Sequence, residues 1–340
     1  MVKTKNNIFN RIIQYVKDNF IFISILLILY IILTFPLNYY IVIGGGTSDV
    51  SSRIEVSDAY SSKGSFNISY VSELQGTVFT YLLSYIFPTW EVEDANLYKY
   101  NDQESIEDIE FRSALDLKTV NGNATYWAYK LAKKEIQLKS RQFYVVTISP
   151  DIKTSFRVGD RILEIDGEEY QTLDEYRNYI QSKRTSDILK VKVLRKEKEV
   201  LLDVPLFEQN NVTMMGVVLQ AMNQYEVSPD VKIEFKRGES GPSGGLITTL
   251  EIYNQLTKKD LTKGRKIAGT GTIEEDGTIG EIGGVEHKLL GAYADKADLF
   301  LVPDGENYEE AIKYKKKKNL KIKIISISSI EDAINKLNNI

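Results

Sequence analysis

The stretch RGESGPSGGLITTLEIY, residues 237–253, joins a run of small residues to an apolar pattern. Glycine, serine and proline dominate residues 238–245, and Leu246, Ile247, Leu250 and Tyr253 then recur at the spacing of one helical face. This pattern predicts a turn that opens directly into a helix, with Ser243 at or beside the first helical turn. Unpaired backbone N–H groups and the positive end of the helix dipole meet there, so the position favours negative charge.

Two interpretations of this turn are open. Serine is a preferred helix cap, and many glycine-serine clusters before helices are caps or phosphate cradles. The same N–H groups can also stabilise an oxyanion beside a serine nucleophile. A second group of motifs bears on the choice: AGTGTI at 268–273, DGTIG at 276–280 and GGVEHKLL at 283–290.

In this order and spacing the motifs resemble the proteolytic domain of the Lon proteases, over about residues 231–303. The resemblance implies that Ser243 is the nucleophile, that Lys288 is the general base and that Thr270 orients the lysine. It also implies an oxyanion loop formed by Gly241, Pro242 and Gly244. The chain departs from the family in having Gly271-Thr272 where Gly-Glu is usual, and Gly244 where alanine is commoner. Neither departure touches the Ser–Lys dyad.

A serine hydroxyl is a weak nucleophile and needs a base. Lysine serves only in its neutral form, although its unperturbed pKa is about 10.4. Burial in an apolar pocket lowers the pKa of a lysine by up to about 3–5. The apolar neighbours Val285, Leu289 and Leu290 are consistent with such a pocket.

The composition limits the alternatives. The chain has 340 residues, enough for two or three domains, and its net charge of −4 argues against nucleic acid as a partner. It has no cysteine and only one histidine, which excludes thiolate chemistry and a clustered histidine metal site. That histidine, His287, precedes Lys288, so the two side chains point about 100° apart on a helix. The sequence contains no P-loop motif, and we expect no cofactor.

The N-terminal segment predicts a membrane anchor. Residues 1–18 are net basic, no charge occurs in residues 19–48, and residues 20–43 are mostly apolar. Such a run is long enough for a bilayer core of about 30 Å. We therefore expect a transmembrane helix at 19–43, a cytoplasmic tail at 1–18 and an extracellular remainder. A cleavable signal peptide, for which no alanine-containing site precedes Ala59, and a buried hairpin are the alternatives. We expect Gly44-Gly45-Gly46 to form a turn or hinge.

Residues 141–206 form a separable unit. Strands are expected at 143–148, 188–195 and 199–205, a helix at 172–181, and the segment GDRILEIDG lies at 159–167. The unit resembles a bacterial PDZ domain, with a generic β-rich domain as the alternative. PDZ domains bind extended peptides at a sheet edge. The resemblance places the peptide near Phe143, Tyr144 and Val145, although Phe143-Tyr144 replaces the usual glycine-containing pair.

Further elements are expected around this unit. We expect helices at 75–86, 121–135 and 285–295, and strands at 53–56, 64–71, 231–235, 266–272, 278–282 and 299–303. Residues 214–219 are assigned to a strand of the protease sheet. Residues 44–140 are expected to complete the protease domain ahead of the insertion, as the resemblance implies, and residues 207–340 to form its main part. Glu239 and Asp276 are expected to have structural roles.

The predicted fold class is α+β: a transmembrane helix, and a PDZ domain inserted in or preceding a Lon-type α/β domain. This architecture resembles the SepM/YlbL group of membrane-anchored Lon-like proteases. It implies an ATP-independent serine endopeptidase at the cell surface that cleaves exposed or flexible peptides, and self-association as in other Lon domains. Two other functions are considered: a catalytically silent scaffold that binds peptides, and a phosphate-binding protein that uses the GESGPSGG loop.

Overall fold

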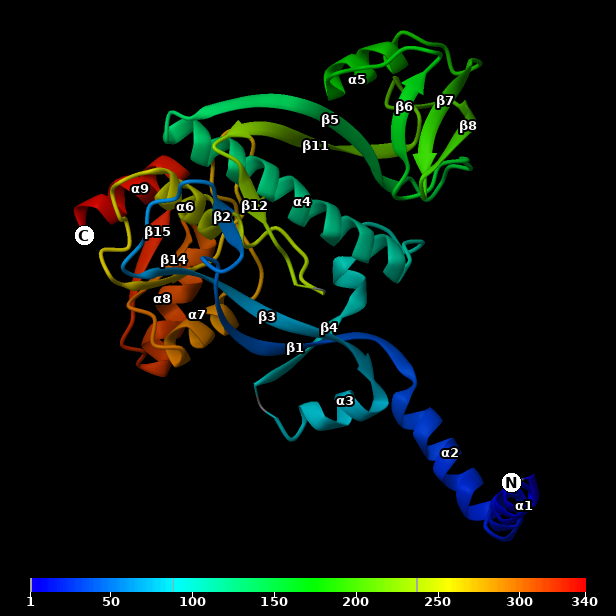
Figure 1. Cartoon of the computed structure of the whole chain (residues 1–340). Coiled ribbons are helices and arrows are strands. Elements are labelled where there is room, and N and C mark those ends of the chain that lie inside the picture. Colours follow the sequence, from blue (N-terminus) through cyan, green and yellow to red (C-terminus); the bar gives the residue numbers. More distant parts are fainter. Residues whose placement is uncertain (1, 88, 237) are drawn as a thin grey trace. The chain divides into compact units, whose positions relative to one another are not determined.

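The chain divides into two units, residues 1–43 with 72–98 and residues 44–71 with 99–340, which we describe separately (Figure 1). The computed structural model describes residues 2–87, 89–236 and 238–340, so Arg237 of the opening stretch lies outside the described residues. Strands β1 (Pro36–Asp49) and β3 (Ser65–Thr77) are long and contribute residues to both units.

The first unit contains the N-terminal helices and a small sheet. Its elements are α1 (Val2–Asp18), α2 (Phe20–Thr34), the first half of β1, the second half of β3, α3 (Val78–Ser84), β4 (Trp90–Asp94) and the 3-10 helix η1 (Ala95–Tyr98). Strand β1 pairs antiparallel with β4, from Tyr39 opposite Asp94 to Ile43 opposite Trp90.

The apolar N-terminal helix is shorter than predicted. We expected a helix over 19–43, but α2 ends at Thr34 and β1 begins at Pro36. A proline disfavours helical backbone at the residue before it, here Phe35. The apolar residues that follow pair with β4 instead of extending the helix.

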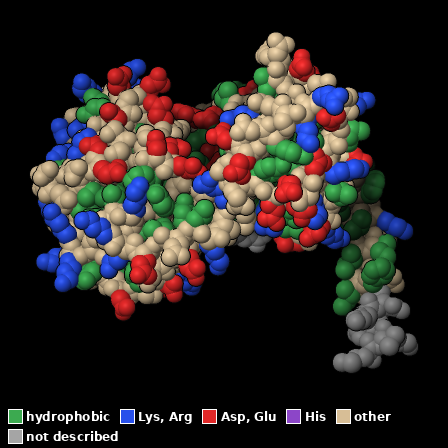
Figure 2. Space-filling view, turned by 90° about the horizontal axis from the view of Figure 1, so that it is seen from above, with side chains coloured by type: hydrophobic (Ala, Val, Ile, Leu, Met, Phe, Trp, Pro, Cys, Tyr) green, Lys and Arg blue, Asp and Glu red, His purple; other side chains and the backbone are tan. Residues whose placement is uncertain are grey.

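Within the described ranges, no single helix combines the length and apolar character needed to cross a membrane. The stretches Ile8–Asp18 and Phe20–Thr34 meet the requirement only as a pair, by length and composition, and the pair is bent by 78°. None of the fifteen residues of α2 is buried. Hydrophobic side chains cover this helical segment at the molecular surface (Figure 2).

The second unit is built on a mixed sheet, in which β3, β13, β14 and β15 are parallel, with helices on both faces (Figure 1). The strand order is β15-β14-β13-β3-β1, with β13 pairing parallel to both β3 and β14. Alternate residues of the strands face opposite sides. Ala268 and Phe300 pack with residues of α7 and α8, whereas Ile267 and Leu301 pack with residues of α4, α6 and α9. The bounds are β13 (Lys266–Gly269), β14 (Leu299–Pro303), β15 (Lys323–Ile327), α6 (Gly245–Leu256), α7 (Val285–Ala294), α8 (Glu306–Lys318) and α9 (Ile330–Asn339).

Helix α4 (Ile106–Leu131) is the longest in the chain's described part and starts well before the predicted 121. A capping box between Ser105 and Asp108 begins it. The first half of α4 carries many charged residues, so the apolar helical pattern in the sequence is clear only in the second half. The second half of α4 packs in the core with α6.

Two short strands, β2 (Ile54–Val56) and β12 (Val231–Ile233), pair antiparallel.

The predicted 141–206 unit is a five-stranded sheet, in the order β11-β5-β6-β7-β8, covered by α5. Its bounds are β5 (Glu135–Ile148), β6 (Arg161–Ile165), α5 (Leu173–Gln181), β7 (Ile188–Arg195), β8 (Lys198–Pro205) and β11 (Val217–Ser228), with a hairpin of β9 (Phe207–Gln209) and β10 (Val212–Met214) before β11. The assignment of residues 214–219 to the protease sheet is wrong, because β11 pairs antiparallel with β5 along its length.

Two further expectations are corrected. Residues 278–282 form no extended strand, since Thr278 makes only an isolated bridge with Ser329. Gly44, Gly45 and Gly46 lie within β1 and form no turn. A side chain at Gly45 would lie 2.1 Å from the Tyr70 carbonyl oxygen, so the glycine is required by close approach of neighbouring backbone.

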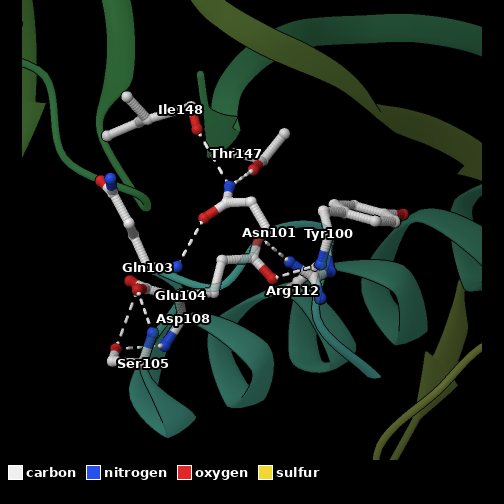
Figure 3. Close-up of polar contacts among 9 residues, drawn as sticks. All are labelled: Tyr100, Asn101, Gln103, Glu104, Ser105, Asp108, Arg112, Thr147 and Ile148. Carbon is white, nitrogen blue, oxygen red and sulfur yellow. Dashed lines mark hydrogen bonds and ion pairs between the residues drawn. The ribbon is translucent and has the colours of Figure 1, made fainter. Parts of the chain in front are cut away.

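A polar cluster fastens the start of α4 to β5 (Figure 3). The Asn101 side-chain amide donates to the carbonyl oxygen of Ile148 at 3.0 Å and to the hydroxyl of Thr147 at 3.2 Å. Arg112 of α4 pairs with Glu104 at 2.6 Å, and their side chains are 8% and 2% exposed. The Arg112 guanidinium also lies 4.0 Å from the centre of the Tyr100 ring. The cluster therefore joins the five-stranded sheet to the rest of the unit.

Candidate active site

Ser243 lies in the turn immediately before α6 and is partly exposed. The residue at the N-cap position is Gly244, and no side chain caps the helix there. The structure therefore does not use Ser243 as the helix cap, which was the main alternative role for this serine.

The neighbouring loop holds the backbone of Ser243 in place. Its carbonyl oxygen accepts hydrogen bonds from the Gly271 N–H at 2.8 Å and from the Thr270 hydroxyl at 3.2 Å. The Gly271 carbonyl in turn accepts a bond from the Leu246 N–H at 3.1 Å. A side chain at Gly245 would lie 2.5 Å from a Val120 methyl carbon, so only glycine fits. These contacts fix the backbone of the turn that carries Ser243.

The predicted oxyanion loop has one correction. The Gly241 N–H donates to the Ser113 carbonyl at 3.0 Å, and Pro242 has no N–H. Gly241 instead supplies a positive φ of 83°, which the turn needs. At Gly244, an added methyl group would lie 2.8 Å from the tip of the Ile68 side chain, so Ile68 fills the space of the commoner alanine.

Lys288 lies in the first turns of α7 and is 4% exposed. The residues one turn to either side, Val285 and Ala292, are fully buried in the core that includes Ala268 of β13. Gly284, in the left-handed conformation at φ 68°, starts the helix. Lys288 is therefore a buried amine near the N-terminal end of α7.

Thr270 follows β13 and is fully buried. Its N–H donates to the Leu301 carbonyl at 3.0 Å, while its hydroxyl reaches the Ser243 carbonyl. The structure thus brings Thr270 and Ser243 together directly. Because a hydroxyl oxygen that donates its proton still has lone pairs, Thr270 can also accept a hydrogen bond from an amine.

Strand β3 connects the serine turn to the lysine helix. A Cβ atom at Gly244 would lie 2.8 Å from Ile68, and one at Gly284 would lie 3.2 Å from Val71. Both residues belong to β3, three positions apart, so the turn before α6 and the start of α7 flank the same short stretch of strand. The ring of His287 lies toward Gly44, with Nδ1 3.7 Å from a Cβ built there.

The two carboxylates near the motifs have structural surroundings, as predicted. Glu239 pairs with Arg53 at 2.6 Å. Asp276 accepts a hydrogen bond from the Thr278 N–H at 2.9 Å in a tight turn. The bonds from Thr278 hold the pKa of the Asp276 carboxyl below its ordinary value. Both groups stabilise loops around the site.

The predicted peptide-binding residues of the five-stranded sheet are corrected. Strand β5 pairs with β11 on one side and with β6 on the other at Phe143 and Tyr144, and the Val145 N–H donates to the Asp160 carbonyl. The side chains of Phe143 and Val145 are buried in the core. These residues present no free edge for a peptide, because both hydrogen-bonding sides of the strand are occupied.

The edge strand beside β5 is β11. A cleft of about 540 Å³ runs along it, lined by Tyr100, Val146, Thr147, Leu173 of α5, Val218, Leu219, Gln220, Ala221 and Glu275. Sequence reasoning missed this edge. The sequence signal for a peptide-binding edge was Met215-Gly216-Val217, in which two apolar residues flank a glycine. Gly216 has a positive φ of 78° and forms the glycine-containing loop that leads into β11.

The acidic groups near this cleft have different surroundings. The Asp116 side chain accepts a bond from Gln220 at 2.9 Å, and burial raises the pKa of its carboxyl. The Glu275 carboxylate accepts a bond from Asn223 at 3.2 Å, and its carbonyl oxygen accepts one from the Trp127 indole at 3.2 Å. Because Glu275 lines the cleft, the cleft reaches the loop that follows Thr270 and Gly271.

Two family models match parts of the chain. A PDZ domain matches residues 130–206, and the C-terminal proteolytic domain of Lon protease (S16) matches residues 212–338. No curated protein matches the chain.

Solved structures match the first of these regions. The PDZ domain of an SdrC-like protein of Listeria monocytogenes is 26% identical, with 23% of this chain and 85% of that chain covered and a TM-score of 0.21. The corresponding domain from Listeria innocua is 25% identical, with 23% and 92% covered and a TM-score of 0.21. The two family matches identify the chain as a Lon-like protease that contains a PDZ domain.

Proposed function

We propose that the chain is a membrane-anchored, ATP-independent serine endopeptidase in which Ser243 is the nucleophile and Lys288 the general base. The observation that carries this proposal is the burial of Lys288, only 4% exposed, in a domain of the Lon proteolytic type. A lysine side chain is seldom buried to this degree. The absence of a P-loop motif from these 340 residues supports a reaction without ATP.

The proposed mechanism gives each group one role. Ser243 Oγ attacks the peptide carbonyl carbon while Lys288 Nζ takes the hydroxyl proton. We assign the amides of Ser243 and Gly244, at the start of α6, as the donors to the developing oxyanion. The lysine ammonium then gives its proton to the leaving amine, and a water molecule, deprotonated by Lys288, hydrolyses the acyl-enzyme. Thr270 Oγ accepts a hydrogen bond from the lysine amine while its own O–H donates to the Ser243 carbonyl.

The PDZ domain supplies peptide binding in this proposal. A peptide adds to the free edge of β11 and lies in the cleft between β11 and α5. The lining of this cleft includes Glu275, in the loop that follows the Thr270 segment. A bound peptide is therefore held next to the proteolytic domain, which favours a recruiting role for the PDZ domain.

The N-terminal helices supply the anchor. None of the fifteen mostly apolar residues of α2 is buried, an arrangement that is favourable in lipid and unfavourable in water. The basic residues of α1 place the N-terminus in the cytoplasm by the positive-inside rule. The catalytic domain then lies outside the cell.

Covalent labelling tests the nucleophile directly. The full chain in detergent is treated with a fluorophosphonate, which modifies activated serines, and the adduct is located by peptide mapping. We expect modification at Ser243 in the wild type and loss of modification in Lys288→Met. Modification at another serine, or none in a folded protein that hydrolyses peptides, contradicts the proposal.

Peptide hydrolysis is expected to rise with pH. Only neutral Lys288 can accept the serine proton, so kcat/KM should increase about tenfold for each pH unit below the pKa of the lysine and then level off. The measurement is hydrolysis of an unstructured fluorogenic peptide from pH 6 to 9, with circular dichroism at each pH as a control for folding. A profile that is flat or falls with pH is the opposite of this expectation.

Leu173→Asp tests the peptide cleft. Leu173 of α5 is 37% exposed and lines the cleft beside β11. A carboxylate there is expected to raise KM for a peptide substrate about tenfold with little change in kcat, since the dyad is untouched. Leu201→Asp is the matched control, because Leu201 is 64% exposed on β8 at the other edge of the sheet. Equal effects of the two substitutions would argue against a peptide in this cleft.

A further inference from the structure

The sequence from the end of β3 to the start of β4 carries no charge between Glu73 and Glu91. Helix α3 lies within it. Its start is stabilised locally by a capping box, in which the Thr80 N–H donates to the Thr77 hydroxyl at 3.2 Å and the Thr77 N–H to the Thr80 hydroxyl at 2.8 Å. The helix therefore forms through its own cap, although none of its residues is buried.

The apolar side chains of this connection are exposed. Phe79 and Leu82 are 50% and 53% exposed, three positions apart on one face of α3. Tyr85, Ile86 and Phe87, which follow the helix, are 75%, 68% and 44% exposed. A patch of large apolar side chains this contiguous is unusual on a surface that faces only water.

The patch lies next to the apolar N-terminal helix. Helices α2 and α3 are in contact and belong to the same unit (Figure 1). None of the residues of either helix is buried, so both need the same apolar surroundings.

The aromatic residues of the segment are of the kind found where lipid meets water. The hydroxyls of Tyr81 and Tyr85 lie 3.2 Å apart, and their rings pack edge to face at 5.6 Å. The rings of Phe87 and Trp90 stack at 5.1 Å. Tyrosine and tryptophan concentrate at membrane interfaces because their rings are apolar and their polar ends remain hydrated.

We propose that α3 and the residues after it insert shallowly into the lipid bilayer beside α2, as a second membrane contact of the first unit. The inference rests on the proposed anchoring through α2. The occupant is lipid and not a protein partner, because the patch is continuous with a helix that is itself to be surrounded by lipid. Glu73, Glu91, Glu93 and Asp94 on the adjoining strands limit the depth of insertion. Because these carboxylates are negative, the attraction between the patch and the bilayer is apolar. Neutral lipid is therefore sufficient for insertion.

Site-specific fluorescence tests the proposal cleanly, because the chain has no cysteine of its own. The full chain is reconstituted in phosphatidylcholine vesicles with a single cysteine carrying an NBD label. Leu82→Cys and Ile86→Cys probe the patch, and Ile28→Cys probes α2. Ser186→Cys, at an exposed position of the PDZ region, is the aqueous control. Lipids with nitroxide groups at shallow and deep positions quench labels according to depth.

We expect the labels at 82 and 86 to emit at shorter wavelength than the label at 186 and to be quenched most by the shallow nitroxide. The label at 28 should be quenched most by the deep nitroxide. Quenching at 28 without quenching at 82 and 86 overturns the second contact and leaves the anchor in place. No quenching at any position overturns both. Peptide hydrolysis by the same samples reports separately on the dyad.

Discussion

Alanine in place of Ser243 is expected to abolish peptide hydrolysis, with kcat/KM reduced at least about 10³-fold. The substitution removes the attacking oxygen, and the contacts that hold the turn are made by the backbone of Ser243 and so remain. Activity is measured with an unstructured peptide, without ATP, on the full chain in detergent. Ser240→Ala is the control, because Ser240 is an exposed serine of the same loop and has no proposed role.

Lys288→Met is expected to cause a loss of the same size. Methionine keeps most of the apolar stem of lysine and lacks the basic nitrogen, so the buried pocket is filled and the base is gone. Lys313→Met, at an exposed position of α8, is the control. Because serine and base act as a unit, the double variant should be no worse than either single variant. Hydrolysis that survives either substitution would refute the Ser–Lys dyad. A folded wild-type protein without activity would favour the catalytically silent scaffold that binds peptides.

The second large effect is on stability. Arg112→Met is expected to lower the free energy of unfolding by about 3–5 kcal/mol, because it leaves the Glu104 carboxylate buried without its partner. The Glu104 side chain is only 2% exposed. Unfolding by urea in detergent, followed by circular dichroism, gives the difference.

A double variant separates charge from packing. Arg112→Met combined with Glu104→Gln removes both charges, and we expect it to recover most of the lost stability. Arg177→Ala breaks an exposed pair with Asp174, whose side chains are 62% and 78% exposed, and should cost less than about 1 kcal/mol. If the double variant is as unstable as Arg112→Met, the buried carboxylate is not the cause of the loss.

The local elements of the proteolytic domain were largely predictable. The pattern after Gly284 predicted a helix at 285–295, and α7 spans Val285–Ala294. Likewise, the buried strand expected at 299–303 is β14. These segments have strong periodicity and glycine boundaries, so short-range information suffices.

Pairing between distant segments was not predictable. Residues 214–219 were assigned to the protease sheet, because an apolar run indicates a strand but not its partner. The pairing with β5 depends on residues more than sixty positions away. The same limit explains Phe143–Val145, whose burial between β6 and β11 follows only from the sheet order.

For the site, motif resemblance named Ser243, Thr270 and Lys288, but local patterns could not show their surroundings. The bond from Thr270 to the Ser243 carbonyl arises where β13 ends beside the turn before α6. Gly44-Gly45-Gly46 looked like a hinge because flexibility and close packing both favour glycine. Only the positions of Tyr70 and Gly291 show that close packing is the reason.

The length of β1 bears on which substrates the proposed enzyme can reach. It begins two residues after the end of α2, and its glycines touch the helix that carries Lys288, at Gly291. Gly45 follows Thr34 by only eleven residues, and an extended chain spans about 3.3 Å per residue. Under the proposed anchoring of α2 in lipid, the segment from Thr34 to Gly45 is at most roughly 36 Å long. On that proposal, we expect the height of a cleavage site above the bilayer to limit hydrolysis as well as the sequence around it.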